Sequence, residues 1–447
     1  MKITKEIIER IEGEATLELE WHEGTIDFAK IKFFNFRGIE KILEKRPLYD
    51  AIAITPRVCG ICSHSHALAS VLAIESCFKT AGDTLEISQK AQDIREIILN
   101  AEKIHNHIKW YFFTIFSELQ KLSHTPFEGN AFKDHVWFQA QKAITETLKM
   151  GAIFSGQWPH GSFAIPGGVT CDPLRMDIIT AQNTLKGVVS FCEEYLYGMP
   201  LEEFLSFNSA LQVMSSVRRL SHGIETMITL GFDRIGRSHD RFLALGDSFL
   251  YEEPSKAVKT TVLSADVKHV HESLEHTFFS NTNKGYTYSK SAQYRRNYFE
   301  VGPLARLMIG KDALIRDFHR RFKDATLTRV VARMSECAHL LVHTRNLLSH
   351  VDISLPSFIA PHANPKDLCG EGIGVIEAAR GSLIHKIDVL YGQIHTYDII
   401  TPTVWNLGNG DKENASVAQK AIMGLDSVEK ADFVFKSFDV CSVCTTQ

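Results

Sequence analysis

Apolar and polar residues alternate near the N-terminus of the chain. The alternation begins at Gly13, breaks at His22-Glu23-Gly24, and resumes up to Phe34. Strict alternation on both sides of a Gly-containing break is typical of two antiparallel strands joined by a turn. The sequence therefore predicts a β-hairpin here.

Longer segments in the middle of the chain repeat apolar residues at helical spacing, and Gly, Pro, Asp, Asn or Ser bound each of them. The predicted helices are Ala67 to Cys77, Leu85 to Leu122, Phe132 to Ile153, Met176 to Tyr197 and Lys311 to His350. After Gly372 the pattern predicts short strands again, at Leu383 to Leu390 and Gln393 to Ile399, then a polar loop at 406–414 and a final short helix. Strands are thus expected near the two ends, with helices between them.

No repeat, low-complexity segment or long Pro/Ser-rich linker divides the chain. Its 447 residues, 44% of them hydrophobic, can bury a large core. We expect a mainly α protein with a single domain over residues 1–447. This domain would be a large helical bundle with small peripheral β-hairpins or sheets near both termini.

Charge gives little information about partners. The 49 basic and 53 acidic side chains leave a net charge of −4, with no long run of one sign. Neither nucleic acid nor an anionic membrane surface is therefore expected to bind. No segment has the roughly 18 uninterrupted apolar residues of a membrane span, and no targeting signal is evident. We expect a cytoplasmic protein, or one that reaches a membrane only through partners.

Four of the nine cysteines form two C-x-x-C pairs near opposite ends of the chain, Cys59 with Cys62 and Cys441 with Cys444. Such pairs favour metal or redox chemistry over a disulfide framework. Taken alone, they suggest a tetrahedral structural zinc or an iron–sulfur site. Structural zinc sites usually keep their ligand pairs within a few tens of residues, whereas this site would join the two ends of the chain.

The residues around the cysteines follow a family pattern. Arg57-x-Cys59-Gly60-x-Cys62-x-x-x-His66 resembles the N-terminal signature of [NiFe] hydrogenase large subunits, and Asp439-x-Cys441-x-x-Cys444-x-x-Gln447 resembles the C-terminal one. Further segments look like family landmarks in family order: Arg10-Ile11-Glu12-Gly13, Phe36-Arg37-Gly38-Ile39-Glu40, Pro166-Gly167-Gly168-Val169-Thr170, Glu300 to Arg306, Glu377-Ala378-Ala379-Arg380-Gly381 and Pro402 to Asn406. The resemblance spans the chain and implies the large-subunit fold and reversible heterolytic cleavage of dihydrogen.

The resemblance implies that all four thiolates bind nickel. Cys59 and Cys441 would be terminal ligands, and Cys62 and Cys444 would bridge nickel to an iron that carries carbon monoxide and cyanide. Soft thiolates suit such a redox-active metal. Cys441 is also counted among the catalytic residues.

Three more residues would serve the reaction by resemblance. Arg380, which follows Ala379 in the cofactor-binding segment, would lie over the centre and polarise dihydrogen. Read alone, it would form a buried ion pair with a residue such as Glu377. Thr403 would hydrogen-bond a cyanide, and in isolation would be a turn residue. Glu12 would relay protons, and in isolation would be a surface glutamate.

Histidines near the site have weaker assignments. His66 would hydrogen-bond a bridging cysteine, or else be a satisfied core histidine. His105 and His107 resemble a histidine-bearing stretch beside the centre, but residues two apart do not share a helix face. At most one of them is expected to face the metals.

A magnesium site is also implied, with the Glu40 carboxylate and the Ile399 carbonyl as ligands. Gln447 replaces the usual C-terminal histidine, and its amide or carboxylate oxygen would suit magnesium. The chain ends there either because an extension has been removed or because the protein never had one.

Other positions depart from the family pattern. Val440 and Ala379 replace prolines, and Asn106 replaces an aspartate near the arginine. As a hypothesis, Ile61 with Phe112 and Phe113 narrows the gas path and limits oxygen access.

The chain has no ferredoxin-like cluster motif, so activity would need an iron–sulfur small subunit, in a heterodimer or a dimer of heterodimers. Its 28 phenylalanines offer apolar surface for that contact. The main alternative is a dihydrogen sensor with the same centre and low turnover. A quinone-site subunit like that of complex I, which lacks the nickel cysteines, and a zinc-stapled structural protein rank lower.

Overall fold

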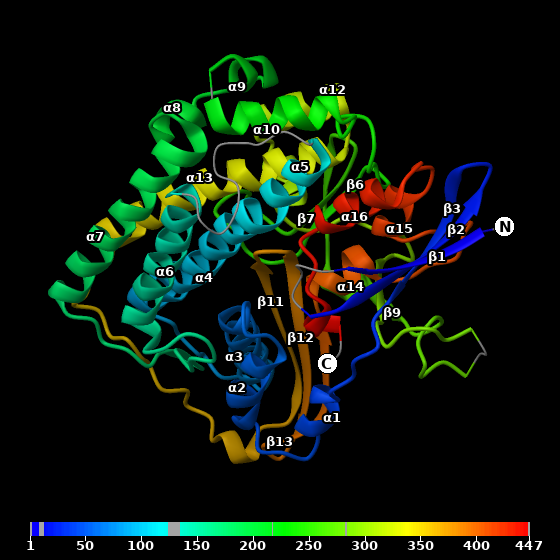
Figure 1. Ribbon diagram of the computed structural model, residues 1–447. Helices are drawn as coiled ribbons and strands as arrows, with labels where there is room; N and C mark the ends of the chain where they lie inside the picture. The colour runs from blue at the N-terminus through cyan, green and yellow to red at the C-terminus, as the bar shows by residue number, and fades with distance from the viewer. Residues whose placement is uncertain (1, 9–12, 124–134, 217, 282–283, 446–447) are drawn as a thin grey trace.

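The computed structural model describes residues 2–8, 13–123, 135–216, 218–281 and 284–445. It is mainly helical with small antiparallel sheets, as expected (Figure 1). Four long helices pack against one another in the bundle: α4 (Gln89–Trp110), α6 (His135–Ser155), α7 (Arg175–Cys192) and α13 (Thr326–His350). Each falls within or close to a predicted helix.

The helix predicted from Leu85 to Leu122 is interrupted. α4 begins where the Ser88 hydroxyl accepts a hydrogen bond from the Ala91 N–H, a normal N-cap. After Trp110 the chain makes a π-helical turn over Tyr111–Ile115, and α5 (Phe116–Ser123) follows. Apolar periodicity does not register such a turn, because the π-turn shifts the helix face by a single residue.

The predicted N-terminal hairpin is present as β2 (Ala15–His22) and β3 (Thr25–Lys32). A third strand, β1 (Lys2–Ile8), pairs with β2 and was not predicted. Its first six side chains are exposed or half-buried, so it lacks the apolar alternation of a strand with one buried face.

A three-stranded antiparallel sheet runs from the middle of the molecule to its lower edge (Figure 1). Its strands are β11 (Gly370–Ala378), β12 (Gly381–Leu390) and β13 (Gln393–Ile400). Helix α3 (Ser63–Thr80) lies against β11. A Cβ at Gly374 would stand 2.0 Å from the Ala69 carbonyl oxygen, so only glycine permits this close packing.

Strands also occur in the middle of the chain, so the expectation of strands near the ends alone was wrong. These strands are two to four residues long, too short to show alternation. They are β4 (Ala164–Ile165), β5 (Gly168–Val169), β6 (Arg241–Ala244), β7 (Ser255–Val258), β8 (Thr261–Ser264), β9 (Val270–Ser273) and β10 (Ser291–Tyr294).

Shorter helices complete the fold: α1 (Ile39–Leu43), α2 (Asp50–Ile54), α8 (Leu201–Leu205), α9 (Ala210–Ser216), α10 (Arg218–Thr229), α11 (Pro303–Ile309), α12 (Ala313–Phe322), α14 (Pro402–Leu407), α15 (Val417–Ile422) and α16 (Val428–Lys436). One large hydrophobic cluster connects the bundle with the sheets. The single-domain division stays a prediction.

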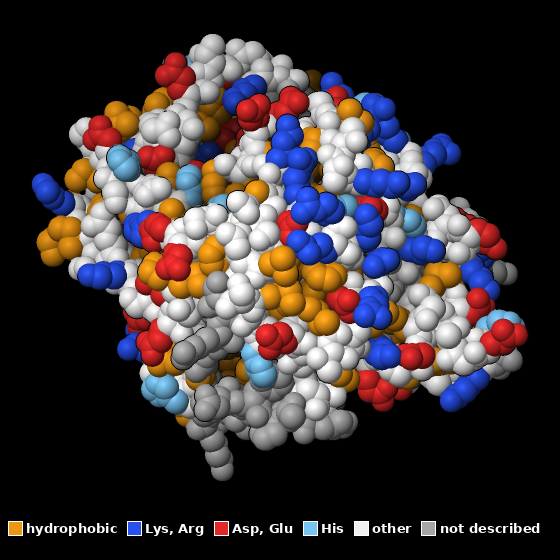
Figure 2. Space-filling model, turned by 90° about the horizontal axis from the view of Figure 1, so that it is seen from above, with side chains coloured by type: hydrophobic (Ala, Val, Ile, Leu, Met, Phe, Trp, Pro, Cys, Tyr) orange, Lys and Arg blue, Asp and Glu red, His pale blue; other side chains and the backbone are white. Residues whose placement is uncertain are grey.

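The net charge of −4 conceals an uneven surface. Figure 2 shows Lys and Arg side chains gathered on one side of the upper face, with fewer Asp and Glu side chains among them. Among the helices of the described residues, none is long and apolar enough to cross a membrane. That no nucleic acid binds stays a prediction.

Candidate metal centre

Four cysteine sulfurs from the two ends of the chain meet inside the molecule. The Sγ atoms of Cys59 and Cys441 are 3.6 Å apart, those of Cys62 and Cys444 are 3.5 Å apart, and those of Cys441 and Cys444 are 2.8 Å apart. All four atoms lie within 4.8 Å of one another, in buried positions. Sulfurs that share one tetrahedral ion at roughly 2.3 Å are about 3.8 Å apart, so this donor set fits a metal.

The thiols are free, and their ionisation is coupled. Contact with Cys441 lowers the pKa of Cys59 well below its usual range, and contact with the same thiol raises the pKa of Cys62. The pKa of Cys444 is raised as well, and the largest cause is its contact with the Cys441 thiol. Several thiolates this close repel one another unless a cation lies between them. The cluster is therefore built to take up a positive ion.

Two side chains hold the cysteine segments together. The Arg37 guanidinium donates to the carbonyls of Val58 and Val443, both at 2.5 Å, and so ties the two segments to each other. The Thr401 hydroxyl donates to the Cys444 carbonyl at 3.0 Å. Arg37 belongs to a segment that already resembled the family, whereas nothing in the sequence marked Thr401.

The segment after Cys62 is fixed by a buried carboxyl group. Glu102 of α4 accepts hydrogen bonds from the backbone N–H groups of His64 at 2.9 Å and Ser65 at 3.2 Å, and from the Ser65 hydroxyl. These are the orphan donors at the first turn of α3. Burial raises the pKa of Glu102 to about 8, although the hydrogen bonds oppose the rise. Sequence reasoning missed this residue.

Arg380 is buried beside the cysteines and pairs with Asp439, not with Glu377 as its isolated reading suggested. Its Nε donates to the Asp439 carbonyl at 2.8 Å, and its Nη2 to Asp439 Oδ1 at 3.1 Å. Nη1 is buried and has no hydrogen-bond partner among the residues that the structure describes. Burial lowers the pKa of Arg380, but the charges of Asp439 and then of the cysteines outweigh this and raise it well above its usual value. Arg380 is therefore a fixed cation.

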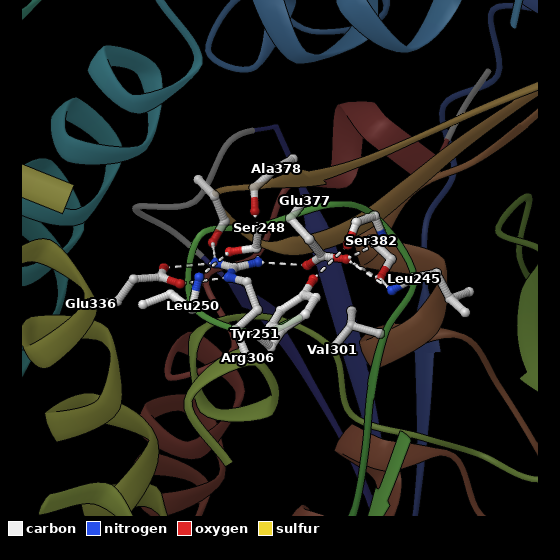
Figure 3. Close-up of polar contacts among 12 residues, drawn as sticks. Leu245, Ser248, Leu250, Tyr251, Val301, Arg306, Glu336, Glu377, Ala378 and Ser382 are labelled. Carbon is white, nitrogen blue, oxygen red and sulfur yellow. Dashed lines mark hydrogen bonds and ion pairs between the residues drawn. The ribbon is translucent and has the colours of Figure 1, made fainter. Parts of the chain in front are cut away.

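Glu377 instead belongs to an ion-pair network around Arg306 (Figure 3). Arg306 donates to Glu377 at 2.9 Å and, through two nitrogens, to Glu336 at 2.5 and 2.7 Å. It also donates to the carbonyl oxygens of Ala378 at 3.0 Å and Ala379 at 3.3 Å. The network thereby fixes the backbone directly before Arg380.

His66 forms a hydrogen bond with another histidine. Its Nδ1 lies 3.0 Å from His385 Nε2, and His385 Nδ1 lies 2.7 Å from the Tyr397 hydroxyl. Burial lowers the pKa of His66 to about 4, so the ring is neutral. The bond from His66 to a bridging cysteine stays a prediction. His385 and Tyr397 were missed because each is a single residue on a strand.

His105 and His107 diverge, as their spacing requires. His107 Nε2 lies 2.8 Å from Glu336 Oε2, a member of the Arg306 network. His105 packs edge-on against Trp158. Its Nδ1 is buried without a hydrogen-bond partner, and burial lowers its pKa to about 3.

Glu40 and Ile399 are adjacent, as a shared site requires. The Ile399 N–H donates to the Glu40 carboxylate at 2.8 Å, and Lys290 Nζ lies 2.7 and 2.9 Å from the two carboxylate oxygens. Glu272 lies 3.5 Å from Lys290, and its Oε1 is buried without a partner. Lys290 and Glu272 were not predicted.

The remaining predicted residues are less informative. Thr403 is buried in the first turn of α14. Ile61 packs against the cysteines, whereas Phe112 contacts Phe191 and Phe113 contacts Trp137. Glu12 and Gln447 lie outside the described residues.

A buried cluster of four thiols beside a fixed arginine, contributed by both ends of the chain, defines a candidate thiolate metal site. The family model "Nickel-dependent hydrogenase" matches residues 37–120 and 114–447. The chain belongs to the nickel-dependent hydrogenase family, whose members are oxidoreductases that act on dihydrogen.

Relatives are distant but extend over nearly the whole chain. The periplasmic [NiFeSe] hydrogenase large subunit of Desulfomicrobium baculatum is 23% identical, with 95% of this chain and 90% of that protein covered. The uptake hydrogenase large subunit of Rhizobium leguminosarum bv. viciae is 24% identical, with 100% and 95% covered. The crystal structure of a reduced, active form of the Desulfomicrobium baculatum Ni-Fe-Se hydrogenase superposes with a TM-score of 0.85 at 21% identity, with 100% of both chains covered. The last match shows a shared fold.

Proposed function

We propose that this chain is the catalytic large subunit of a [NiFe] hydrogenase, and that Cys59, Cys62, Cys441 and Cys444 hold its nickel–iron centre. The observation that carries the proposal is the meeting of four buried thiol groups from opposite chain ends beside the Arg380 cation. A nickel–iron centre would supply the site at which dihydrogen is split into protons and electrons.

The chain's own groups would manage charge and protons. Arg380, held by Asp439, keeps a positive charge beside the thiolates and polarises dihydrogen. A thiolate such as that of Cys441 accepts the first proton, and Glu12 passes it outward. Both catalytic assignments derive from the family pattern, and so do the hydrogen bond from Thr403 to a cyanide and the cofactor-binding assignment of Ala379.

We further propose a magnesium ion between Glu40, Glu272 and the Ile399 carbonyl, with Gln447 nearby. The unpartnered Glu272 oxygen supports this, because carboxylate and carbonyl oxygens suit a hard cation. Lys290 would then share the two carboxylates with the ion.

Electrons need a path out, and the chain has no cluster-binding motif of its own. Both relatives described above are named as large subunits of hydrogenases. We therefore propose that the partner is an iron–sulfur small subunit.

The test is metal analysis and infrared spectroscopy of the purified complex. We expect one nickel per large subunit with iron in excess, because the clusters of the small subunit add iron, together with bands from iron-bound carbon monoxide and cyanide and dihydrogen-dependent dye reduction. Cys441→Ser should abolish dye reduction, while Cys369→Ser, at an exposed cysteine outside the cluster, should leave it unchanged. Zinc without nickel would refute the proposed function and would favour the alternative of a zinc-stapled structural protein.

A further inference from the structure

Asp439 lies between two buried arginines. Arg380 Nη2 binds Asp439 Oδ1 at 3.1 Å, and Arg333 Nη1 binds Asp439 Oδ2 at 2.7 Å. Each carboxylate oxygen therefore has its own guanidinium, and the pair of arginines leaves a surplus positive charge beside the cysteines. The side chains of Arg380, Arg333 and Asp439 are only 6%, 4% and 8% exposed, so water does not compete for these contacts.

Arg333 is itself held by one turn of α4. Its Nη1 lies 3.2 Å from Asn106 Oδ1 and 3.3 Å from His107 Nδ1. Its guanidinium carbon lies 4.7 Å from the centroid of the Trp110 ring, a cation–π contact. Trp110 in turn donates to the Lys436 carbonyl at 3.0 Å. The orientation of Arg333 is thus set by α4 and not by Asp439 alone.

The Arg306 network fixes the proton on His107. Burial raises the pKa of Glu336, but Arg306 outweighs burial and lowers it, so Glu336 is a carboxylate. His107 Nε2, 2.8 Å from it, must then carry the hydrogen, which leaves Nδ1 to accept from Arg333. A continuous row of contacts therefore leads from Arg306 (Figure 3) through Glu336, His107, Arg333 and Asp439 to Arg380.

The contact between Arg333 and Asp439 determines which N–H groups of Arg380 bind the Asp439 carboxylate. A carboxylate with a vacant oxygen favours a bidentate pair with arginine. Because Arg333 already holds Asp439 Oδ2, Arg380 binds the carboxylate through Oδ1 alone. Its Nη1 stays buried without a partner among the described residues, on a guanidinium whose charge interacts with the cysteines.

We propose that Arg333 is a positioning residue for the reaction: by engaging Asp439 Oδ2, it keeps Arg380 Nη1 available to the group that the four cysteines hold. The inference rests on the proposed hydrogenase function. In this proposal Arg333, the second arginine bound to Asp439, orients Arg380 and does not itself touch the reacting atoms.

The test compares Arg333→Met with wild type in the purified complex. The variant keeps Asp439 paired with Arg380, so it leaves no charge unpaired. We expect unchanged nickel and iron content, shifted infrared bands of the iron-bound ligands, and a kcat for dihydrogen oxidation reduced up to about a hundredfold, with a smaller change in KM. Arg333→Lys, which retains a cation, should recover part of kcat and move the bands back.

Arg95→Met is the matched control. Arg95 is a comparably buried arginine, paired with Glu75 at 2.7 Å, and none of its hydrogen bonds is to Asp439 or a cluster cysteine. It should lower stability without moving the infrared bands. Bands and kcat of Arg333→Met equal to wild type would overturn the inference. A loss of nickel from Arg333→Met large enough to account for its lower kcat would overturn it as well. Wild-type protein without nickel or the bands would instead refute the proposed function itself.

Discussion

Tyr397 determines how His385 presents its ring to His66. The hydroxyl lies 2.7 Å from His385 Nδ1 in a buried setting. Tyr397→Phe leaves that nitrogen without a partner, which costs about 1 to 3 kcal/mol of unfolding free energy. Urea unfolding measures the loss. Tyr391→Phe, at a 79% exposed ring on the same sheet, should cost nothing measurable. Equal stability of the two variants would show that the hydroxyl contributes nothing.

Lys103 is a buried lysine of α4 whose positive charge lowers the stability of the folded protein. Burial lowers its pKa from 10.5 to about 8, and the Arg306 charge adds to the effect. The folded pKa lies below the unfolded one, so protonated Lys103 destabilises the fold below about pH 8, and this cost disappears as the pH rises to about 10.5.

Lys103→Met should therefore stabilise the protein by about 3 kcal/mol at pH 7. The difference from wild type should shrink steadily above pH 8, which unfolding series at pH 7 and pH 10 would show. Lys142→Met, at an exposed lysine of α6, should give equal differences at both pH values. A gain from Lys103→Met that did not depend on pH would attribute the effect to packing alone.

At the scale of elements, the contact of α3 with β11 positions the first cysteine pair, because α3 begins directly after Cys62. Gly374→Ala would place a methyl group 2.0 Å from the Ala69 carbonyl oxygen and force the helix away from the sheet. We expect a loss of about 3 kcal/mol or more together with lower nickel content. Denaturant unfolding and metal analysis measure both.

The control is Gly187→Ala in α7, where an added Cβ meets nothing within 4 Å. This change should be neutral or should stabilise by up to about 1 kcal/mol. If Gly374→Ala behaved in the same way, the close approach of α3 to β11 would not be essential.

The helices and the site were predictable to different degrees. Long amphipathic helices such as α7 could be predicted from periodicity, because a helix with one buried face needs apolar residues at fixed spacing. The close packing of β11 against α3 was not predictable, since it depends on glycines in β11 that let the helix approach, and glycine carries no periodic signal. The strands between Arg241 and Tyr294 were missed because four residues cannot show alternation.

The site divides in the same way. Cys59, Cys62, Cys441 and Cys444 were found because paired cysteines are rare and their spacing has chemical meaning. Arg333, Thr401 and Glu102 were not, because each is an ordinary residue whose role comes from a partner more than 35 positions away. Long-range hydrogen bonds leave no local pattern in a sequence.

At the scale of the whole molecule, the thiol cluster joins two segments separated by 382 positions. A metal bound by both pairs would tie the C-terminal cysteine segment to the start of α3, in addition to the Arg37 bonds. Metal should therefore protect the C-terminal segment far more than the distant helices of the bundle.

Hydrogen exchange of loaded and metal-free complex tests this. We expect faster exchange after metal removal in residues 437–445 and 57–66, on the order of tenfold or more, since opening no longer breaks metal–thiolate bonds. Helix α7, which contributes no residue to the cluster, serves as the internal reference and should exchange at the same rate in both forms. Equally faster exchange along the whole chain would mean that the metal stabilises the fold globally. An unchanged exchange rate at 437–445 would mean that the hydrogen bonds of Arg37 and Thr401 are enough to hold the C-terminal segment in place.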